Sequence, residues 1–214
     1  MHQIKNIIFD LGGVLFNIDY HKTISAFKDL GIPNFDEIYS KTKQTALFDS
    51  FETGKITEEQ FIAGLKKQMP SHINYEEIIK AWNAMLLNLP NERVEFLKSI
   101  RDNYNIVLLS NTNETHITAF EEIIFAQNGL KNLNPLFDKV YYSSRIKLRK
   151  PNAECFHYVL NDSQFNVDET LFFDDSIQHI EGSLAAGIKA LHVDNSKTIL
   201  DFFDTNYKLK TIIL

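Results

Sequence analysis

The chain of 214 residues is long enough for one α/β domain of ordinary size with a modest insertion. Hydrophobic residues make up 44% and charged residues 23%, which is typical of a globular protein and excludes a disordered chain. The formal net charge is −6 without a long run of Lys or Arg, and Cys155 is the single cysteine, so nucleic-acid binding and a disulfide framework are both disfavoured.

The first predicted element is the apolar run "NIIFD" at 6–10, which is typical of a short buried strand of a parallel sheet. It ends on one acidic residue, Asp10, and Gly12 follows two positions later. Because Asp10 interrupts the run and no small-residue cleavage site follows, we expect no signal peptide. No window of about 18 apolar residues is present, so we expect no membrane span and a cytoplasmic protein.

Residues 17–89 contain no convincing strand pattern and are predicted to be helical. The two segments "TEEQFIAGLKKQM" and "NYEEIIKAWNAMLLNLP" each begin with a potential capping box, formed by Thr57 with Gln60 and by Asn74 with Glu77. We therefore predict an all-helical module inserted after the first strand.

After residue 90, apolar strand patterns alternate with segments of helical period, which predicts a doubly wound, Rossmann-like parallel sheet of the α/β class. The predicted strands are 105–112, 139–144, 170–175 and 189–194. The predicted helices are 91–104, 114–127, 152–162 and 176–187. The last segment, "YKLKTIIL" at 207–214, is expected to be an edge strand.

Acidic residues follow two of the predicted strands. Ligands of an open parallel sheet bind at the carboxyl ends of the strands, where Asp10 and the pair Asp174 and Asp175 are expected to meet. Carboxylates that close together require protonation or a counter-cation. Oxygen ligands suit a hard ion, so this cluster predicts a Mg²⁺ site.

The stretch "NIVLLSNT" at 105–112 ends in Ser110 and Asn111, whose hydroxyl, amide and backbone N–H groups suit a phosphate at the start of a helix. Lys150, in the basic segment "RIKLRKPN", is suited to neutralising that phosphate and the crowded aspartates. The neighbouring cations are interpreted as a solvated loop: Arg145, Lys147 and Arg149.

Other chemically active side chains are interpreted as structural. The histidines do not cluster at metal-ligand spacing, and each of His116, His157 and His179 lies inside a helical pattern. Cys155 is expected to be a small apolar residue of a helix, and Trp82 a core residue of the helical insertion.

Four elements thus occur in one order: the strand-end Asp10, "LLSNT", Lys150 before Pro151, and "FFDD". Together they resemble the haloacid dehalogenase superfamily, which consists mostly of phosphatases that pass the phosphoryl group through an aspartate. The resemblance implies a core domain of residues 1–16 and 90–214 and a helical cap domain of residues 17–89. It implies a small phosphorylated metabolite as substrate, with no nucleic-acid or membrane partner.

The resemblance also implies a role for each matching position. Asp10 would be the nucleophile and a Mg²⁺ ligand, and Gly12 would offer its backbone carbonyl to the metal. Ser110 and Asn111 would bind the phosphate, and Lys150 would contact both Asp10 and the phosphate. Asp175 would complete the metal site, with Asp174 beside it.

Gly12 departs from the family pattern, because the usual phosphatase has an aspartate there that protonates the leaving alcohol. Losing such a group typically costs about 10²-fold to 10⁴-fold in rate. A substrate with an acidic leaving group, such as a sugar 1-phosphate like α-D-glucose 1-phosphate, would need less help. Alternatively, Asp19 or His21 at the entrance to the cap would donate the proton.

Two other functions are compatible with Gly12. A 2-haloacid dehalogenase attacks carbon with the same aspartate and needs no acid for the leaving halide, but it also needs no metal site. A catalytically silent binding protein would retain the fold without turnover, although keeping Asp10, Lys150 and both late aspartates without chemistry would be costly to stability.

Overall fold

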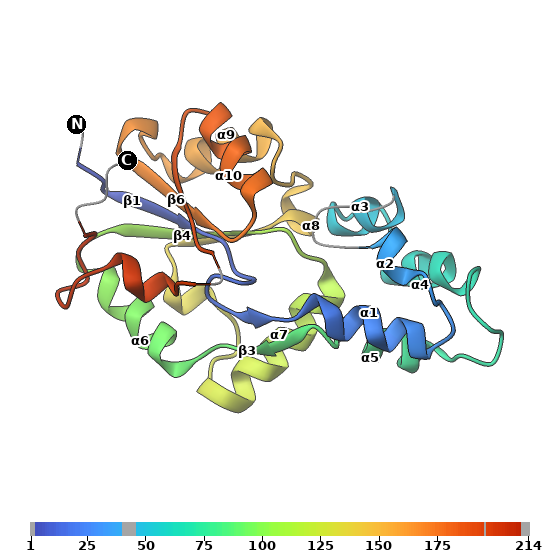
Figure 1. Cartoon of the computed structure of the whole chain (residues 1–214). Coiled ribbons are helices and arrows are strands. Elements are labelled where there is room, and N and C mark those ends of the chain that lie inside the picture. Colours follow the sequence, from blue (N-terminus) through green and yellow to red (C-terminus); the bar gives the residue numbers. More distant parts are fainter. Residues whose placement is uncertain (1–2, 40–45, 195, 211–214) are drawn as a thin grey trace.

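A single parallel sheet forms the centre of the larger part of the molecule (Figure 1). The computed structural model describes residues 3–39, 46–194 and 196–210. Within them the five strands lie in the order β5-β4-β1-β6-β7, so the first strand is central. Their bounds are β1 Asn6–Phe9, β4 Asn105–Ser110, β5 Lys139–Tyr142, β6 Thr170–Asp174 and β7 Lys189–His192. The doubly wound α/β fold predicted from the sequence is confirmed.

Helices cover both faces of this sheet because the side chains of each strand alternate between two apolar layers. Ile7 and Phe9 of β1 belong to the layer that also contains residues of α6 and α7, whereas Ile8 belongs to the layer under α9. The helices of the sheet are α6 Asn91–Ile100, α7 Glu114–Asn128, α9 Ala153–Ser163 and α10 Ile177–Ala185, with short 3₁₀ turns at Asn134–Leu136, Val167–Glu169 and Ile199–Phe202. Cys155 of α9 is buried as an apolar residue.

The cap helices α1–α5 lie beyond the carboxyl ends of the strands (Figure 1) and have a hydrophobic cluster of their own. Trp82 is fully buried in that cluster, with Phe48 and Phe61 packed against its ring. The helices are α1 Tyr20–Asp29, α2 Phe35–Ile38, α3 Ala46–Glu52, α4 Glu58–Lys66 and α5 Tyr75–Asn83. Both predicted capping boxes are present, at the starts of α4 and α5. No helix among the described residues is long and apolar enough to span a bilayer.

A short ribbon joins the cap helices to the sheet. Its strands, β2 Asn17–Ile18 and β3 Leu86–Asn88, pair antiparallel at the two points where the chain leaves and re-enters the core. The prediction of no strand in 17–89 was therefore wrong, and α5 ends at Asn83 instead of continuing toward Pro90. Strands of two and three residues are too short to produce an alternating pattern, and these two pair only because the insertion brings its ends together.

Two further segments differ from the predictions. Residues 139–144 were predicted as one strand, but β5 ends at Tyr142, and the short helix α8 Ser143–Ile146 follows. In the segment 207–214, Leu209 forms one isolated bridge with Phe203, and the described part, up to residue 210, contains no strand. Residues 211–214 lie outside the described residues.

Candidate active site

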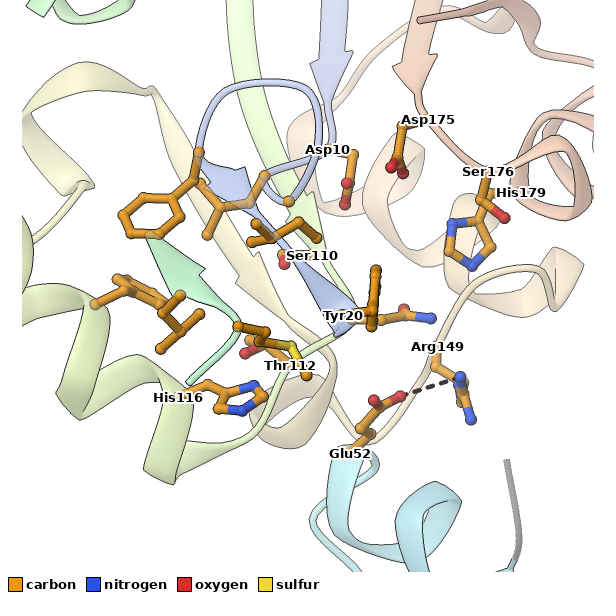
Figure 2. A pocket seen from close by; sticks show the side chains of 18 of the residues that line it. Asp10, Tyr20, Glu52, Ser110, Thr112, His116, Arg149, Asp175, Ser176 and His179 are labelled. Carbon is orange, nitrogen blue, oxygen red and sulfur yellow. Dashed lines mark ion pairs between the residues drawn. The ribbon is translucent and has the colours of Figure 1, made fainter. Parts of the chain in front are cut away.

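One pocket lies where the carboxyl ends of β1, β4 and β6 face the cap helices. Figure 2 shows its side chains, with Asp10 and Asp175 near one end and Glu52 and Arg149 near the other. It is lined by Asp10, Leu11, Gly12, Phe16, Ile18, Tyr20, Tyr39, Glu52, Met85, Leu86, Ser110, Asn111, Thr112, His116, Phe120, Arg149, Asp175, Ser176 and His179.

Lys150 binds two of the predicted aspartates beneath this pocket. Its Nζ lies 2.5 Å from Oδ1 of Asp10 and 2.7 Å from Oδ2 of Asp174, and its side chain has no exposed surface. Asp10 directly follows β1 and Asp174 ends β6, so neighbouring strands bring the two carboxylates together. Burial alone would lower the pKa of Lys150, but Asp10 and Asp174 outweigh burial and raise it above the usual value.

The acidic cluster contains more negative charge than Lys150 neutralises. Burial raises the pKa of Asp10, and the charges of Asp174 and Asp175 add to the rise, although Lys150 opposes it. For Asp174, burial also favours a higher pKa, but Lys150 and His179 outweigh burial and lower it. The site thus favours an additional cation next to Asp10.

Asp10, Asp174 and Asp175 fit a divalent cation. One carboxylate oxygen from each lies within 4.8 Å of the others, and hard oxygen donors of this kind are those that Mg²⁺ prefers. Gly13 makes the approach of Asp175 possible: its φ is +79°, and a Cβ added there would lie 2.1 Å from Oδ2 of Asp175. The excess negative charge and the donor set both match the predicted metal site.

The phosphate-binding residues predicted after β4 also lie in the pocket, and one of them has a second function. Ser110 is buried at the end of β4 and lines the pocket. The side chain of Asn111 donates to the carbonyl of Lys150 at 2.9 Å and accepts from its backbone N–H at 3.0 Å. Asn111 therefore fixes the backbone that positions the lysine.

The other end of the pocket is formed by an ion pair that the sequence did not predict. Arg149 lies 3.0 Å from Oε2 of Glu52 and 2.6 Å from Oδ1 of Asp49, both on α3. The exposed fractions of the Arg149 and Glu52 side chains are 17% and 8%. The interpretation of Arg149 as a solvated loop residue was therefore wrong, because the cap covers it. Its neighbours do lie in an exposed segment: Arg145 pairs with Glu114, and Lys147 donates to the carbonyl of Gly54.

Tyr20, at the start of α1, also lines the pocket and was not predicted from the sequence. Burial raises the pKa of Tyr20 well above its usual value, and the charges of Asp175 and Glu52 add to the rise. The phenol therefore stays neutral and available as a hydrogen-bond donor between the two acidic ends.

Two histidines interpreted as structural line the pocket. Nδ1 of His179 lies 3.0 Å from each carboxylate oxygen of Asp174, within the first turns of α10. His116 is buried against Trp82, its Nε2 lies 3.1 Å from the Trp82 carbonyl, and burial lowers its pKa to about 4. His116 thus holds the cap to the core, as a structural residue does, whereas His179 belongs to the acidic cluster. His157 is exposed on α9.

The two proposed substitutes for the missing acid do not line the pocket. Asp19 is the N-cap of α1, where its Oδ1 accepts from the backbone N–H of His21 at 2.9 Å. The side chain of His21 is exposed. Both lie at the entrance to the cap, as expected, but neither is among the residues around the cavity.

Strand-end carboxylates with a buried lysine, a donor set that fits a divalent cation and a pocket covered by helices are the features expected of a metal-dependent phosphohydrolase. The model of the haloacid dehalogenase-like hydrolase family matches residues 4–187. The chain therefore belongs to this family, and the family predicted from the ordered motifs is confirmed.

Similar proteins give the reaction class and the metal. A D-ribitol-5-phosphate phosphatase of Bacteroides thetaiotaomicron is 32% identical over 193 residues, covering 90% of this chain and 93% of the relative. A solved structure of a family enzyme from B. thetaiotaomicron, in complex with magnesium and inorganic phosphate, has a TM-score of 0.81 at 30% identity, covering 94% of this chain and 100% of that one. The structure of a predicted hydrolase from Porphyromonas gingivalis also has a TM-score of 0.81 at 30% identity, covering 92% of this chain and 94% of that one. The protein is an enzyme of the phosphatase type, with Mg²⁺ as cofactor.

Proposed function

We propose that the enzyme hydrolyses the phosphate monoester of a small sugar or polyol through a phosphoaspartate on Asp10. The observation that carries the proposal is the contact of buried Lys150 with both Asp10 and Asp174, beside Asp175 and at the floor of one pocket. A nucleophile, a cation and a metal-binding donor set then share one small volume.

The residues divide the work as follows. Asp10 is the nucleophile, and Asp10, Asp175 and the backbone carbonyl of Gly12 would hold the metal. Both oxygens of Asp174 accept hydrogen bonds, from Lys150, the backbone N–H of Ser176 and His179. Asp174 therefore serves mainly to position Lys150 beside the metal ligands.

In the reaction, a carboxylate oxygen of Asp10 attacks phosphorus and the bond to the substrate alcohol breaks. The departing alkoxide takes a proton from water, because Gly12 supplies no acid. A second water then attacks phosphorus of the phosphoaspartate, which releases inorganic phosphate and restores the Asp10 carboxylate. A Mg²⁺ ion held there would neutralise charge on the phosphate oxygens.

The other roles follow from the pocket walls. Ser110 and the backbone N–H groups after β4 bind the phosphate oxygens, and Lys150 stabilises the charge that develops there. The core domain, residues 1–16 and 90–214, supplies this chemistry. The cap domain, residues 17–89, covers the site and limits the access of bulk solvent to it.

Two substrates are the first candidates. D-Ribitol 5-phosphate is suggested by the name of the 32% identical relative. α-D-Glucose 1-phosphate is suggested by Gly12, because an anomeric hydroxyl leaves without a strong acid and because this chain's motifs also resemble those of the bacterial α-D-glucose-1-phosphate phosphatase. Hydrolysis of D-ribitol 5-phosphate would require water alone to protonate the departing alkoxide of a primary alcohol.

The test is phosphate release from a panel of sugar and polyol phosphates, with p-nitrophenyl phosphate as a general substrate, with and without Mg²⁺. We expect release that requires Mg²⁺ and is absent in Asp10→Asn. Activity that survives in Asp10→Asn would exclude the phosphoaspartate. Halide release from 2-haloacids without metal would indicate a dehalogenase. Ligand-induced stabilisation without any turnover would indicate a silent binding protein.

A further inference from the structure

The end of the pocket remote from Asp10 contains its own charged group. Glu52 and Arg149 both line the cavity, pair with each other at 3.0 Å, and are almost covered by protein. They come from different parts of the fold (Figure 2), since Glu52 ends α3 of the cap, whereas Arg149 belongs to the core and directly precedes Lys150 in the sequence. Because Asp10 lines the same cavity, the leaving group of a substrate whose phosphate lay at Asp10 would extend toward this pair.

The described residues at this end carry more negative than positive charge. Arg149 faces two carboxylates, because Asp49 also contacts its guanidinium at 2.6 Å. Among the residues that the structure describes, Arg149 is the only arginine or lysine that lines the pocket. A carboxylate or second phosphate on the leaving group would therefore meet one cation that two acids already neutralise, and like charges placed together disfavour binding.

The polar groups at this end suit hydroxyl groups instead. A carboxylate accepts hydrogen bonds, a guanidinium donates them, and a hydroxyl does both. The neutral phenol of Tyr20, which lies between the two ends of the pocket (Figure 2), adds a donor. Ile18, Met85 and Leu86 line the same cavity and offer an apolar surface to the C–H groups of a carbohydrate.

We infer that Glu52 and Arg149 select the leaving group, admitting uncharged polyhydroxyl groups and rejecting anionic ones. This inference rests on the proposed phosphatase function and adds to it the residues and the charge that decide the substrate class. Glu52 is the decisive member, because it lines the pocket and its side chain is only 8% exposed, whereas Asp49 lies outside the pocket lining and its side chain is 44% exposed.

The experiment compares matched esters that differ in one charge: glycerol 3-phosphate with 3-phosphoglycerate, and α-D-glucose 1-phosphate with α-D-glucuronic acid 1-phosphate. For the unaltered enzyme we expect kcat/KM to favour the neutral member of each pair at least about tenfold. In Glu52→Gln, which keeps the size of the side chain, we expect this preference to fall at least about tenfold, mainly through a lower KM for the anionic ester.

Asp49→Asn is the matched control, because it removes one charge from the same arginine but lies outside the pocket lining. We expect a clearly smaller change in preference from it, and thermal melting of each variant reports folding. Equal use of both members of the pairs, or an unchanged preference in a folded Glu52→Gln, would overturn the inference while the phosphatase function stands. If p-nitrophenyl phosphate is hydrolysed but no neutral carbohydrate ester is, the inference is also wrong. Absence of phosphate release from every ester would instead overturn the proposed function.

Discussion

The two ends of the pocket use the same residue types in different structural settings. At the end that contains Asp10, called the phosphate end below, one buried cation, Lys150, contacts carboxylates at the ends of adjacent strands of one sheet. At the cap end, one cation, Arg149, meets carboxylates of a helix that has a separate hydrophobic cluster. The sheet hydrogen bonds fix the first arrangement, whereas the second exists only while the cap lies over the core. We infer that the residues around Lys150 keep a fixed arrangement, and that the selection of substrate by Glu52 and Arg149 depends on the position of the cap.

Replacing Lys150 should have the largest effect, because it removes the only lysine that Asp10 and Asp174 contact in the described residues. In Lys150→Met we expect kcat to fall about 10²-fold to 10³-fold, since a charge-stabilising group is lost. We also expect a loss of about 3–5 kcal/mol in unfolding free energy, measured by urea denaturation without added Mg²⁺, because two buried carboxylates remain uncompensated.

The double variant Lys150→Met with Asp174→Asn separates these two effects. Removing the negative charge of Asp174 as well should restore a large part of the unfolding free energy without restoring activity. If the double variant is as unstable as Lys150→Met, then the repulsion between Asp10 and Asp174 is not the cause. If Lys150→Met is as stable as the unaltered protein, the phosphate end is not held together by charge at all.

Gly12→Asp tests the source of the proton for the leaving group. A Cβ built on Gly12 meets Cδ1 of Ile18 at 2.9 Å, and this is the far end of a flexible side chain that can move aside. An aspartate there would supply the missing acid, so we expect a rise of up to about 10²-fold in kcat for glycerol 3-phosphate. For α-D-glucose 1-phosphate we expect a rise of less than about tenfold, because its leaving group needs less protonation.

Gly13→Ala is the control for a steric effect in the same loop. Its Cβ would lie 2.1 Å from Asp175, at a backbone φ of +79° that favours glycine, so we expect loss of activity toward both esters. Equal gains on both esters in Gly12→Asp would argue against the role of leaving-group acidity.

His116 tests the joint between the cap and the core. Because burial holds its pKa at about 4, below the usual 6.5, the folded protein keeps the ring neutral. Below pH 6.5 the ring of His116 takes up a proton in the unfolded chain but stays neutral in the folded protein. The free energy of unfolding is therefore highest above pH 6.5 with respect to this residue, and it decreases as the pH falls toward 4. We expect a loss of about 2 kcal/mol at pH 5.

The measurement is urea unfolding at pH 7 and pH 5 for the unaltered protein and for His116→Gln, which has no titrating ring. The difference between the two proteins should shrink by that amount at pH 5. A constant difference would show that His116 has the same pKa in both states, and that the joint does not depend on a neutral ring.

The sheet and the phosphate end could be predicted because the information lies in short stretches of sequence. Buried parallel strands are continuous apolar runs, so the five strands predicted from such runs are present, with ends shifted by at most two residues. The edge strand expected at 207–214 is not formed in the described part of that segment. The residues that follow such strands must lie at one edge of the sheet. This is why Asp10, Ser110, Asp174 and Asp175 could be placed together before their contacts were known.

The cap end could not be predicted, because it depends on packing between distant segments. Glu52 lies near Arg149 because the end of α3 is held against the core, where Ser143 of α8 donates to the Glu52 carbonyl at 2.6 Å and Lys147 donates to the carbonyl of Gly54. No short pattern encodes that contact. His179 was missed for a different reason: inside an amphipathic helix its position resembles that of any structural histidine, although it lies one turn after Asp174 and reaches that carboxylate.

Asp19→Ala should have the smallest effect and decides between a structural and a catalytic role at the entrance to the cap. Asp19 accepts a hydrogen bond from the backbone N–H of His21 at 2.9 Å, and neither residue lines the pocket. Loss of this N-cap should lower the unfolding free energy by about 1 kcal/mol. We expect kcat for glycerol 3-phosphate, the ester that needs an acid most, to change less than about twofold, whereas a proton donor would cost about 10²-fold or more. Asp19→Asn separates the two roles, because asparagine can still cap the helix but cannot donate the proton. Full activity in both Asp19→Asn and Asp19→Ala leaves water as the source of the proton. A matching large loss of activity in both variants would instead place the acid at Asp19.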